Sequence, residues 1–191
     1  DTGIEMLRNW LGEFLDTLKV ETLSVGQLSD DEAESLAKAK PHLRSLLFGS
    51  AQVQEIVRRP FFAKVLNQSY MADPSASTFA PQSEVDLIEN WWRRGGYNET
   101  GQNALERQRA LLDLASVRAR QLSQPIALSQ LTSVAHIDGL RSDGILQNAR
   151  EGVSVRFAHD IFFEWAFFHV IADRGLQWMG VIKACGEPPA V

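Results

Sequence analysis

The sequence predicts an α+β protein that is mainly α. Several segments place apolar residues three and four positions apart, as amphipathic helices do, and some of them follow a serine that can cap a helix. The alternation of apolar and polar residues that is typical of strands is confined to two short stretches, residues 19–25 and residues 145–157. Because the chain has 191 residues and is 45% hydrophobic, it can bury a core.

The first forty residues predict a helix, a strand and a second helix. Residues 4–18 are amphipathic, and residues 19–25 alternate weakly as a strand does. Ser29, with Glu32 three positions later, has the pattern of a capping box, and acidic residues near it suit the positive end of a helix dipole. A helix should therefore begin after Ser29 and end before Pro41.

The strand at residues 19–25 stands alone in a region that is otherwise helical. A lone strand leaves its backbone donors and acceptors unpaired, which is costly when the strand is buried. The chain also begins at Asp1, without a methionine. We therefore expect the chain to be a piece of a larger protein, with the strand belonging to a sheet that lies mostly outside it.

The next segment predicts short helices separated by turns. Residues 41–68 contain two short helices with a break near Gly49, and Pro60 either kinks the second helix or opens a third. Residues 71–82 are rich in small and turn-forming residues and predict a loop.

Two amphipathic helices follow this loop. The first begins after Ser83 and ends at the Gly95-Gly96 pair, since glycine is the usual residue just past a helix C-terminus. The second covers residues 104–122 and ends before Pro125.

The last third of the chain predicts a winged helix-turn-helix. Residues 126–146 contain two short helical pieces and end in a turn at Gly144. Residues 145–157 then form a hairpin candidate with a polar turn at residues 150–152. Helix, short helix, short helix and hairpin is the element order of a winged helix-turn-helix, and a long aromatic-rich helix follows directly from Asp160.

Common phosphate-binding and metal-binding motifs are absent from the sequence. It contains no G-x-x-x-x-G-K-[ST], G-x-G-x-x-G, H-E-x-x-H or C-x-x-C. The net charge is −5, and no part of the chain has the basic excess that attracts nucleic acid. The histidines and the single cysteine are scattered, so we expect no metal site. These residues are His42, His136, His159, His169 and Cys185.

Features of the chain ends and of cysteine usage favour a cytoplasmic protein. The N-terminal residues do not form the basic and then apolar pattern of a signal peptide. Residues 155–171 are strongly apolar, but they carry too many polar and charged side chains for a membrane span. A single cysteine cannot form an internal disulfide, which favours a reducing compartment.

Four segments occur in an order that points to a known family. The segment "RFAHDIFFEW" (156–165) fits the pattern F-x-H-x-x-F-x-E-[FYW], and "LRSDGIL" (140–146) fits L-x-x-x-G-I-L. Upstream are "IVRRPFFAKVLNQ" (56–68), with a lid-like x-x-P-x-x-L segment, and "KVETLSVGQLSDDEAESL" (19–36), a strand leading into a helix. Together they resemble STAND-type P-loop ATPases, the group that includes NACHT proteins.

The resemblance covers most of residues 16–175 and implies how the chain is divided. The implied parts are the end of an ATPase core at 1–40, a helical lid at 41–100, a winged-helix domain at 101–175, and a tail or the start of the next module at 176–191.

The resemblance also implies two residues that contact nucleotide. By position, Pro60 matches the lid proline that packs near the adenine, and His159 matches the winged-helix histidine that reaches the phosphates of bound ADP and holds the closed, inactive state. An imidazole N–H can donate to a phosphate oxygen, and a proton on the ring adds charge assistance. The implied function is regulatory: the chain couples the ADP or ATP state of a signalling ATPase to the opening of its domains.

Several components of such an ATPase are not encoded in this chain. Without a P-loop, it should neither hydrolyse nor tightly bind ATP, so we expect no enzyme activity and no cofactor of its own; ATP or ADP and Mg²⁺ would be cofactors of the parent ATPase. The implied partners are the missing P-loop core, the adjacent domains of the same protein, and further copies in an oligomer that forms on activation.

Structural roles for the same residues stay open. His159 can be a cap or core residue, Pro60 can simply begin a helix, and Glu164 can pair with Arg156 or fix a turn. The aromatic residues around the last helix would then be core, and because they cover nearly all of its sides, we expect that helix to be buried on several faces. These aromatic residues are Phe157, Phe162, Phe163, Trp165, Phe167 and Phe168.

Two other functions remain as alternatives. The first is a winged-helix DNA-binding transcriptional regulator, although the second short helical piece offers only Arg141 to bases, and Asp138 and Asp143 would repel phosphate. The second is a protein-protein interaction module in which the aromatic helix is an exposed docking face.

Overall fold

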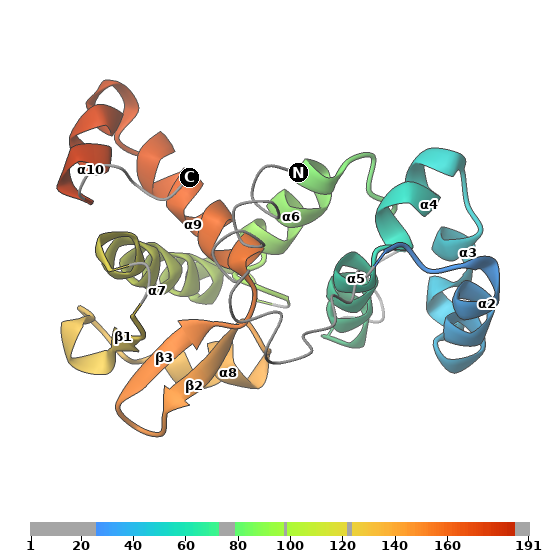
Figure 1. The fold of residues 1–191 in the computed structure, drawn as a ribbon, viewed down its shortest axis with the longest axis horizontal. Coiled ribbons are helices and arrows are strands. Elements are labelled where there is room, and N and C mark those ends of the chain that lie inside the picture. Colours follow the sequence, from blue (N-terminus) through green and yellow to red (C-terminus); the bar gives the residue numbers. More distant parts are fainter. Residues whose placement is uncertain (1–25, 73–78, 98, 122–123, 186–191) are drawn as a thin grey trace, which may run out of the picture.

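A computed structural model confirms the mainly helical α+β fold (Figure 1). It describes residues 26–72, 79–97, 99–121 and 124–185. Within these ranges, the strands form a three-stranded antiparallel sheet, and the rest of the regular structure is helical. None of the helices described is both long and apolar enough to cross a membrane. The helix predicted at 4–18 and the strand predicted at 19–25 lie outside the described residues.

Helix α2 (Asp30–Ala39) begins at the predicted capping box. The Ser29 hydroxyl accepts a hydrogen bond from the Glu32 N–H at 3.3 Å, and the Glu32 carboxylate accepts one from the Ser29 N–H at 2.8 Å. The Ser29 N–H and the Ser29 hydroxyl both donate to this carboxylate and favour its ionised form, so they lower the pKa of Glu32. The helix ends before Pro41, as predicted, and the chain continues into η1 (Pro41–Leu43) and α3 (Arg44–Leu47).

The break predicted near Gly49 separates α3 from α4 (Ala51–Val57), whose first turn is capped by the Ser50 hydroxyl. Pro60 is the first residue of α5 (Pro60–Ala72). It therefore opens a third helix and does not kink the second. A proline is well tolerated at that position because the first N–H of a helix has no partner within the helix.

Helix α6 (Glu84–Arg93) is capped by Ser83, as predicted, and is followed by a tight turn. Gly95 in this turn has a φ of 58°, in the left-handed region that favours glycine. A Cβ on Gly95 would lie 2.9 Å from the Cα of Ala104, which belongs to α7 (Gly101–Arg120). Glycine therefore allows both the turn and the close approach of the two backbones.

The segment after α7 contains the sheet and two short helical pieces. Its elements, in chain order, are β1 (Ile126–Ala127), η2 (Leu128–Gln130), α8 (Ile137–Ser142), β2 (Leu146–Arg150) and β3 (Ser154–Phe157).

The strands pair in the order β1-β3-β2. The predicted hairpin is present, with Leu146 opposite Phe157, and Val153 lies in its turn and not in a strand. Strand β1, which pairs Ile126 with Val155, was not predicted. Because β1 has only two residues, it is too short to show the alternation that identifies a strand in a sequence.

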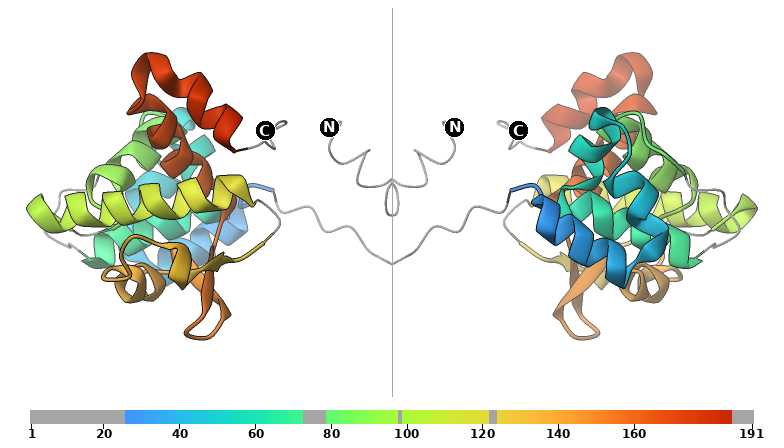
Figure 2. Two further views of the ribbon diagram at one scale, coloured as in Figure 1. Left: turned by 90° about the vertical axis from the view of Figure 1, so that its left-hand side faces the viewer. Right: turned by 90° about the vertical axis from the view of Figure 1, so that its right-hand side faces the viewer.

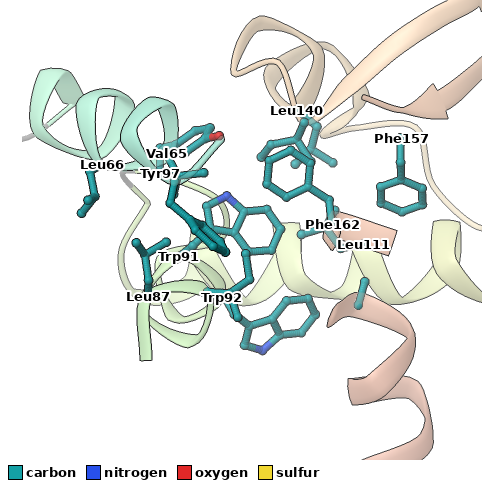
Figure 3. Packing of buried hydrophobic residues seen from close by; sticks show 14 of the residues in the cluster. Val65, Leu66, Leu87, Trp91, Trp92, Tyr97, Leu111, Leu140, Phe157 and Phe162 are labelled. Carbon is teal, nitrogen blue, oxygen red and sulfur yellow. The ribbon is translucent and has the colours of Figure 1, made fainter. Parts of the chain in front are cut away.

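The first turns of helix α9 (Asp160–Ala172) pack against elements from the earlier part of the chain. Phe162 is buried and stacks on Trp91 of α6, with ring centroids 4.8 Å apart. Leu111 of α7 and Leu140 of α8 belong to the same apolar core (Figure 3). Elements that are distant in the sequence therefore share one hydrophobic core.

The second half of α9 is more exposed than we expected. Phe162 and Ala166 are the residues of α9 that are buried, whereas Phe168 is 52% exposed. This half continues into η3 (Gly175–Gln177) and α10 (Trp178–Ala184), which stand out at the edge of the molecule (Figure 2). Phe168 therefore departs from the expectation that α9 is buried on several faces, whereas Phe167 and Val170 in the same half pack partly against the core.

Arg107 of α7 is a buried charged residue, 5% exposed. Its guanidinium pairs with the carboxylates of Asp143 and Glu99. Burial raises the pKa of Tyr97 nearby, and the charge of Asp143 raises it further, so the phenol stays protonated. These contacts connect α7 to the end of α8.

Gly95 and Gly101 allow the close packing of the turn after α6 against α7 to be tested. Gly95 and Gly101 have nearly equal φ values, 58° and 57°, but only Gly95 is close to another backbone. Gly101→Ala should cost about 1 kcal/mol, for the strained backbone alone. Gly95→Ala should cost about 3 kcal/mol, because the added methyl group also overlaps Ala104. Urea unfolding midpoints would measure both, and equal losses would contradict the packing described.

Candidate functional site

Pro60 and His159 line the same open hollow, although they are far apart in the sequence. The hollow has a volume of about 570 Å³, and Gly26, Gln27, Arg59 and Phe61 complete its lining. Both Pro60 and His159 are exposed to solvent. The two residues singled out from the sequence are thus brought together, while their contact with nucleotide remains a prediction.

The side of the hollow around Pro60 is held by contacts with neighbouring elements. The N–H of Leu28 donates to the carbonyl of Arg58 at 2.7 Å, which ties the segment before α2 to the end of α4. Arg59 forms an ion pair with Glu84 at the start of α6. Contacts with the segment before α2 and with α6 therefore hold the start of α5 in place. The positive charge of Arg59 is neutralised by Glu84.

The imidazole of His159 packs against Phe61. Their ring centroids are 4.1 Å apart and their planes are inclined by 31°. Phe61 also contacts Phe162 of α9, with centroids 5.4 Å apart. Phe61 thus connects the hollow to the hydrophobic core and covers part of the imidazole, the rest of which is open to solvent.

His159 is also the N-cap of α9. Its Nδ1 accepts a hydrogen bond from the Ile161 N–H at 3.4 Å, a long bond. A neutral imidazole has one acceptor and one donor nitrogen, so this cap assigns the hydrogen to Nε2. A protonated ring has no acceptor and would lose the cap. The cap therefore leaves the Nε2–H as the ring donor available to a ligand.

His159 also lines a second open hollow, of about 490 Å³. Arg118, at the end of α7, and Arg156, on β3, both line it. Arg118 donates to the carbonyl of Gln124 at 3.1 Å, at the rim of the same hollow. His159 therefore lines both a hollow at the start of α5 and a polar hollow beside the sheet.

The sequence did not indicate the roles of Phe61, Arg118 and Arg156. Phe61 follows Pro60 directly, but an aromatic residue inside an amphipathic helix is first taken for core. Arg156 lies on a strand between the buried residues Val155 and Phe157, which shows that it faces away from the core but not what it faces.

Glu164 does not form the ion pair that the sequence suggested. Its side chain is exposed, and within the described residues no ion pair joins it to Arg156. The two residues lie on different elements, β3 and α9, whose directions diverge after His159 (Figure 1).

Helix α8, the piece that would contact bases in a DNA-binding protein, has six residues. Arg141, its one candidate for base contact, already donates to Asp138 at 2.5 Å and to Asn148 at 2.8 Å. Asp143 pairs with the buried Arg107, so it does not face outward as the sequence suggested. The face of α8 is therefore occupied by contacts within the protein.

Among the residues that the structure describes, no group of three or more histidine, cysteine or acidic side chains is arranged to hold a metal ion. Comparison with models of protein families and a search of curated proteins find no match for this chain.

Three substitutions would separate the capping role of His159 from any ligand contact. His159→Ala should destabilise the protein by about 1 kcal/mol, because it leaves the first turn of α9 uncapped. His159→Asn and His159→Ser should cost less, because both side chains are good caps. Urea unfolding would measure the three values, and equal stability of all three variants would contradict a cap at this position.

Proposed function

We propose that this chain is the regulatory lid and winged-helix portion of a cytoplasmic STAND/NACHT-like signalling ATPase. In this role it couples the ADP or ATP state of that protein to the opening of its domains. It contributes no catalytic residue, and the P-loop, the Mg²⁺ site and most of the nucleotide-binding surface come from the rest of the ATPase.

The observation that carries this proposal is the hollow shared by Pro60 and His159. The same resemblance implied both residues, from two segments about 100 positions apart, and they meet in space. The packing of Phe61 on His159 brings them together at one open hollow.

The chemistry of this hollow suits a nucleotide. The rings of Pro60 and Phe61 offer apolar surface for an adenine, and the Nε2–H of His159 offers a donor for a phosphate oxygen. Its volume of about 570 Å³ is within the range of small-molecule sites. Because the hollow is open, a nucleotide would need a second wall, which fits a site completed by a P-loop core.

The element order supports the winged-helix part of the proposal. A long helix, α7, is followed by a short strand, two short helical pieces and a hairpin. The first strand pairs with the second strand of the hairpin, which closes a small sheet next to the helices. The motif "RFAHDIFFEW" then falls at the junction of this sheet with α9.

A contact between His159 and phosphate can couple nucleotide state to domain opening. A ligand shifts a conformational equilibrium only by the difference in its affinity for the two states. A hydrogen bond to a charged phosphate, present only in the closed state, would contribute about 2 kcal/mol, or roughly a thirtyfold shift toward closure. Loss of this single contact is enough to change the population of the open state.

A protein-interaction role is the second candidate, and it rests on a different part of the chain. Leu176 is 100% exposed, and Trp178 and Met179 nearby are 43% and 47% exposed. These residues belong to η3 and α10, and α10 lies apart from α5, the helix that Pro60 begins (Figure 1). The two roles are compatible, because a regulatory segment also docks on adjacent domains.

Titration of the 191-residue chain with ADP, followed by NMR of its histidine ring protons, tests the proposed function. Since one wall of the site is missing, we expect weak binding, with a Kd of about 1 mM. The His159 signal should shift with ADP, whereas the signal of His136, which contacts Glu106 on α7, should not. Phe61→Ala should weaken the effect.

The proposal would be contradicted by an ADP titration that leaves His159 unchanged or that moves all histidine signals equally. Adenosine and inorganic pyrophosphate, titrated separately, show which end of the nucleotide reaches which residue. Adenosine should affect Phe61, and pyrophosphate should affect His159.

A further inference from the structure

The second hollow contains two arginines whose charges are not compensated by an ion pair. Arg118 and Arg156 line it from α7 and β3, together with the amide side chains of Gln124 and Gln147. Among the described residues, no carboxylate lies within ion-pair distance of either guanidinium. Asp160 at the edge of the hollow is the one acidic side chain in its lining.

Three arginines elsewhere in the protein are paired with carboxylates. Arg58 pairs with Asp30, Arg59 with Glu84, and Arg107 with two carboxylates. Two like charges that face one space repel each other, and water screens this repulsion only in part. An anion between the two guanidiniums would remove the repulsion, so the arrangement is suited to bind one.

The sheet fixes the position of Arg156. Val155 and Phe157 are buried, so the alternation of the strand turns Arg156 to the opposite face. β3 is the middle strand, and Arg156 is paired in register with Gln147 of β2. The guanidinium is therefore carried by a strand residue that is paired with β2 and adjoins Val155, which pairs with both β1 and β2.

His159 lines both hollows, and this connects the arginines to the first one. Suppose that the base of a nucleotide lies at Pro60 and that one phosphate accepts from the Nε2–H of His159. The remaining phosphates could then enter the second hollow, which His159 also lines. We propose that the hollow between Arg118 and Arg156 binds the polyphosphate end of that nucleotide. Arginine suits this ligand because its planar fork can donate two parallel hydrogen bonds to phosphate oxygens. This inference rests on the proposed function.

Arg118 and Arg156 should give the site a preference for longer phosphate chains. A single phosphate reaches His159, whereas a second and a third phosphate add contacts with the arginines. Affinity should therefore increase from AMP to ADP to ATP, and high salt should weaken ATP most, because its binding depends most on charge.

The test compares Arg156→Ala with Arg150→Ala in the 191-residue chain, using inorganic pyrophosphate as the probe. Arg150 is an exposed residue of the same hairpin and does not line either hollow, so its loss changes the net charge equally. Arg156→Ala should weaken pyrophosphate binding about tenfold, the expected loss of one charge-assisted hydrogen bond. Arg150→Ala should change it less than twofold, and Arg156→Lys should restore it only in part.

Binding is measured from the shifts of the arginine side-chain Nε–H signals and of the His159 ring. Equal losses in Arg156→Ala and Arg150→Ala would overturn the inference, because they would indicate unspecific attraction to the net charge. So would a preference for duplex DNA over pyrophosphate with a steep dependence on salt, the sign of a nucleic-acid surface.

The same titrations separate this inference from the proposed function. If pyrophosphate shifts Arg118 and Arg156 but ADP leaves Phe61 unchanged, the polyphosphate site stands and the nucleotide role of the hollow at Pro60 fails. If ADP shifts Phe61 and His159 but Arg156→Ala binds ADP and pyrophosphate as tightly as the unaltered chain, the proposed function stands and the arginine site fails.

Discussion

The stacking of Trp91 on Phe162 is the contact on which the arrangement of this protein depends. It joins α6 to α9 in the buried core, and both rings are almost completely removed from solvent. Burial of two such rings contributes several kcal/mol to stability. Phe162 also contacts Phe61 of α5, which packs on His159, so the same cluster places the imidazole next to the start of α5. The candidate site is thus a consequence of core packing.

Features that depend on neighbouring residues were predicted well from the sequence. The capping box of Ser29 and Glu32, the break at Gly49 and the hairpin before α9 all have local patterns, and all are present. Contacts between distant segments were not predicted. Strand β1 exists because Ile126 meets Val155, and Arg107 is buried because a carboxylate from the end of α8 meets it. No pattern within a short window of sequence contains that information.

The candidate site shows the same division between local and distant information. Pro60 and His159 were selected from motifs, but their shared hollow, the contact with Phe61 and the arginines beyond His159 follow from the fold. The structure also adds a role for His159 that the motif did not give. Because Nδ1 caps α9, Nε2 is the ring nitrogen left to donate to a ligand. The proposed ligand contact of His159 and its capping role fall on one side chain, so loss of function in a variant has to be compared with its stability.

The proposed regulatory role requires that a nucleotide lies between Pro60 and His159. A crystal structure of the chain soaked with ADP tests this claim most directly, because it shows the position of both ends of the ligand. We predict density for the base against Pro60 and Phe61, and a phosphate oxygen within about 3 Å of His159 Nε2, the distance of a normal hydrogen bond. A nucleotide bound elsewhere, or one whose phosphates point away from the imidazole, would contradict the account.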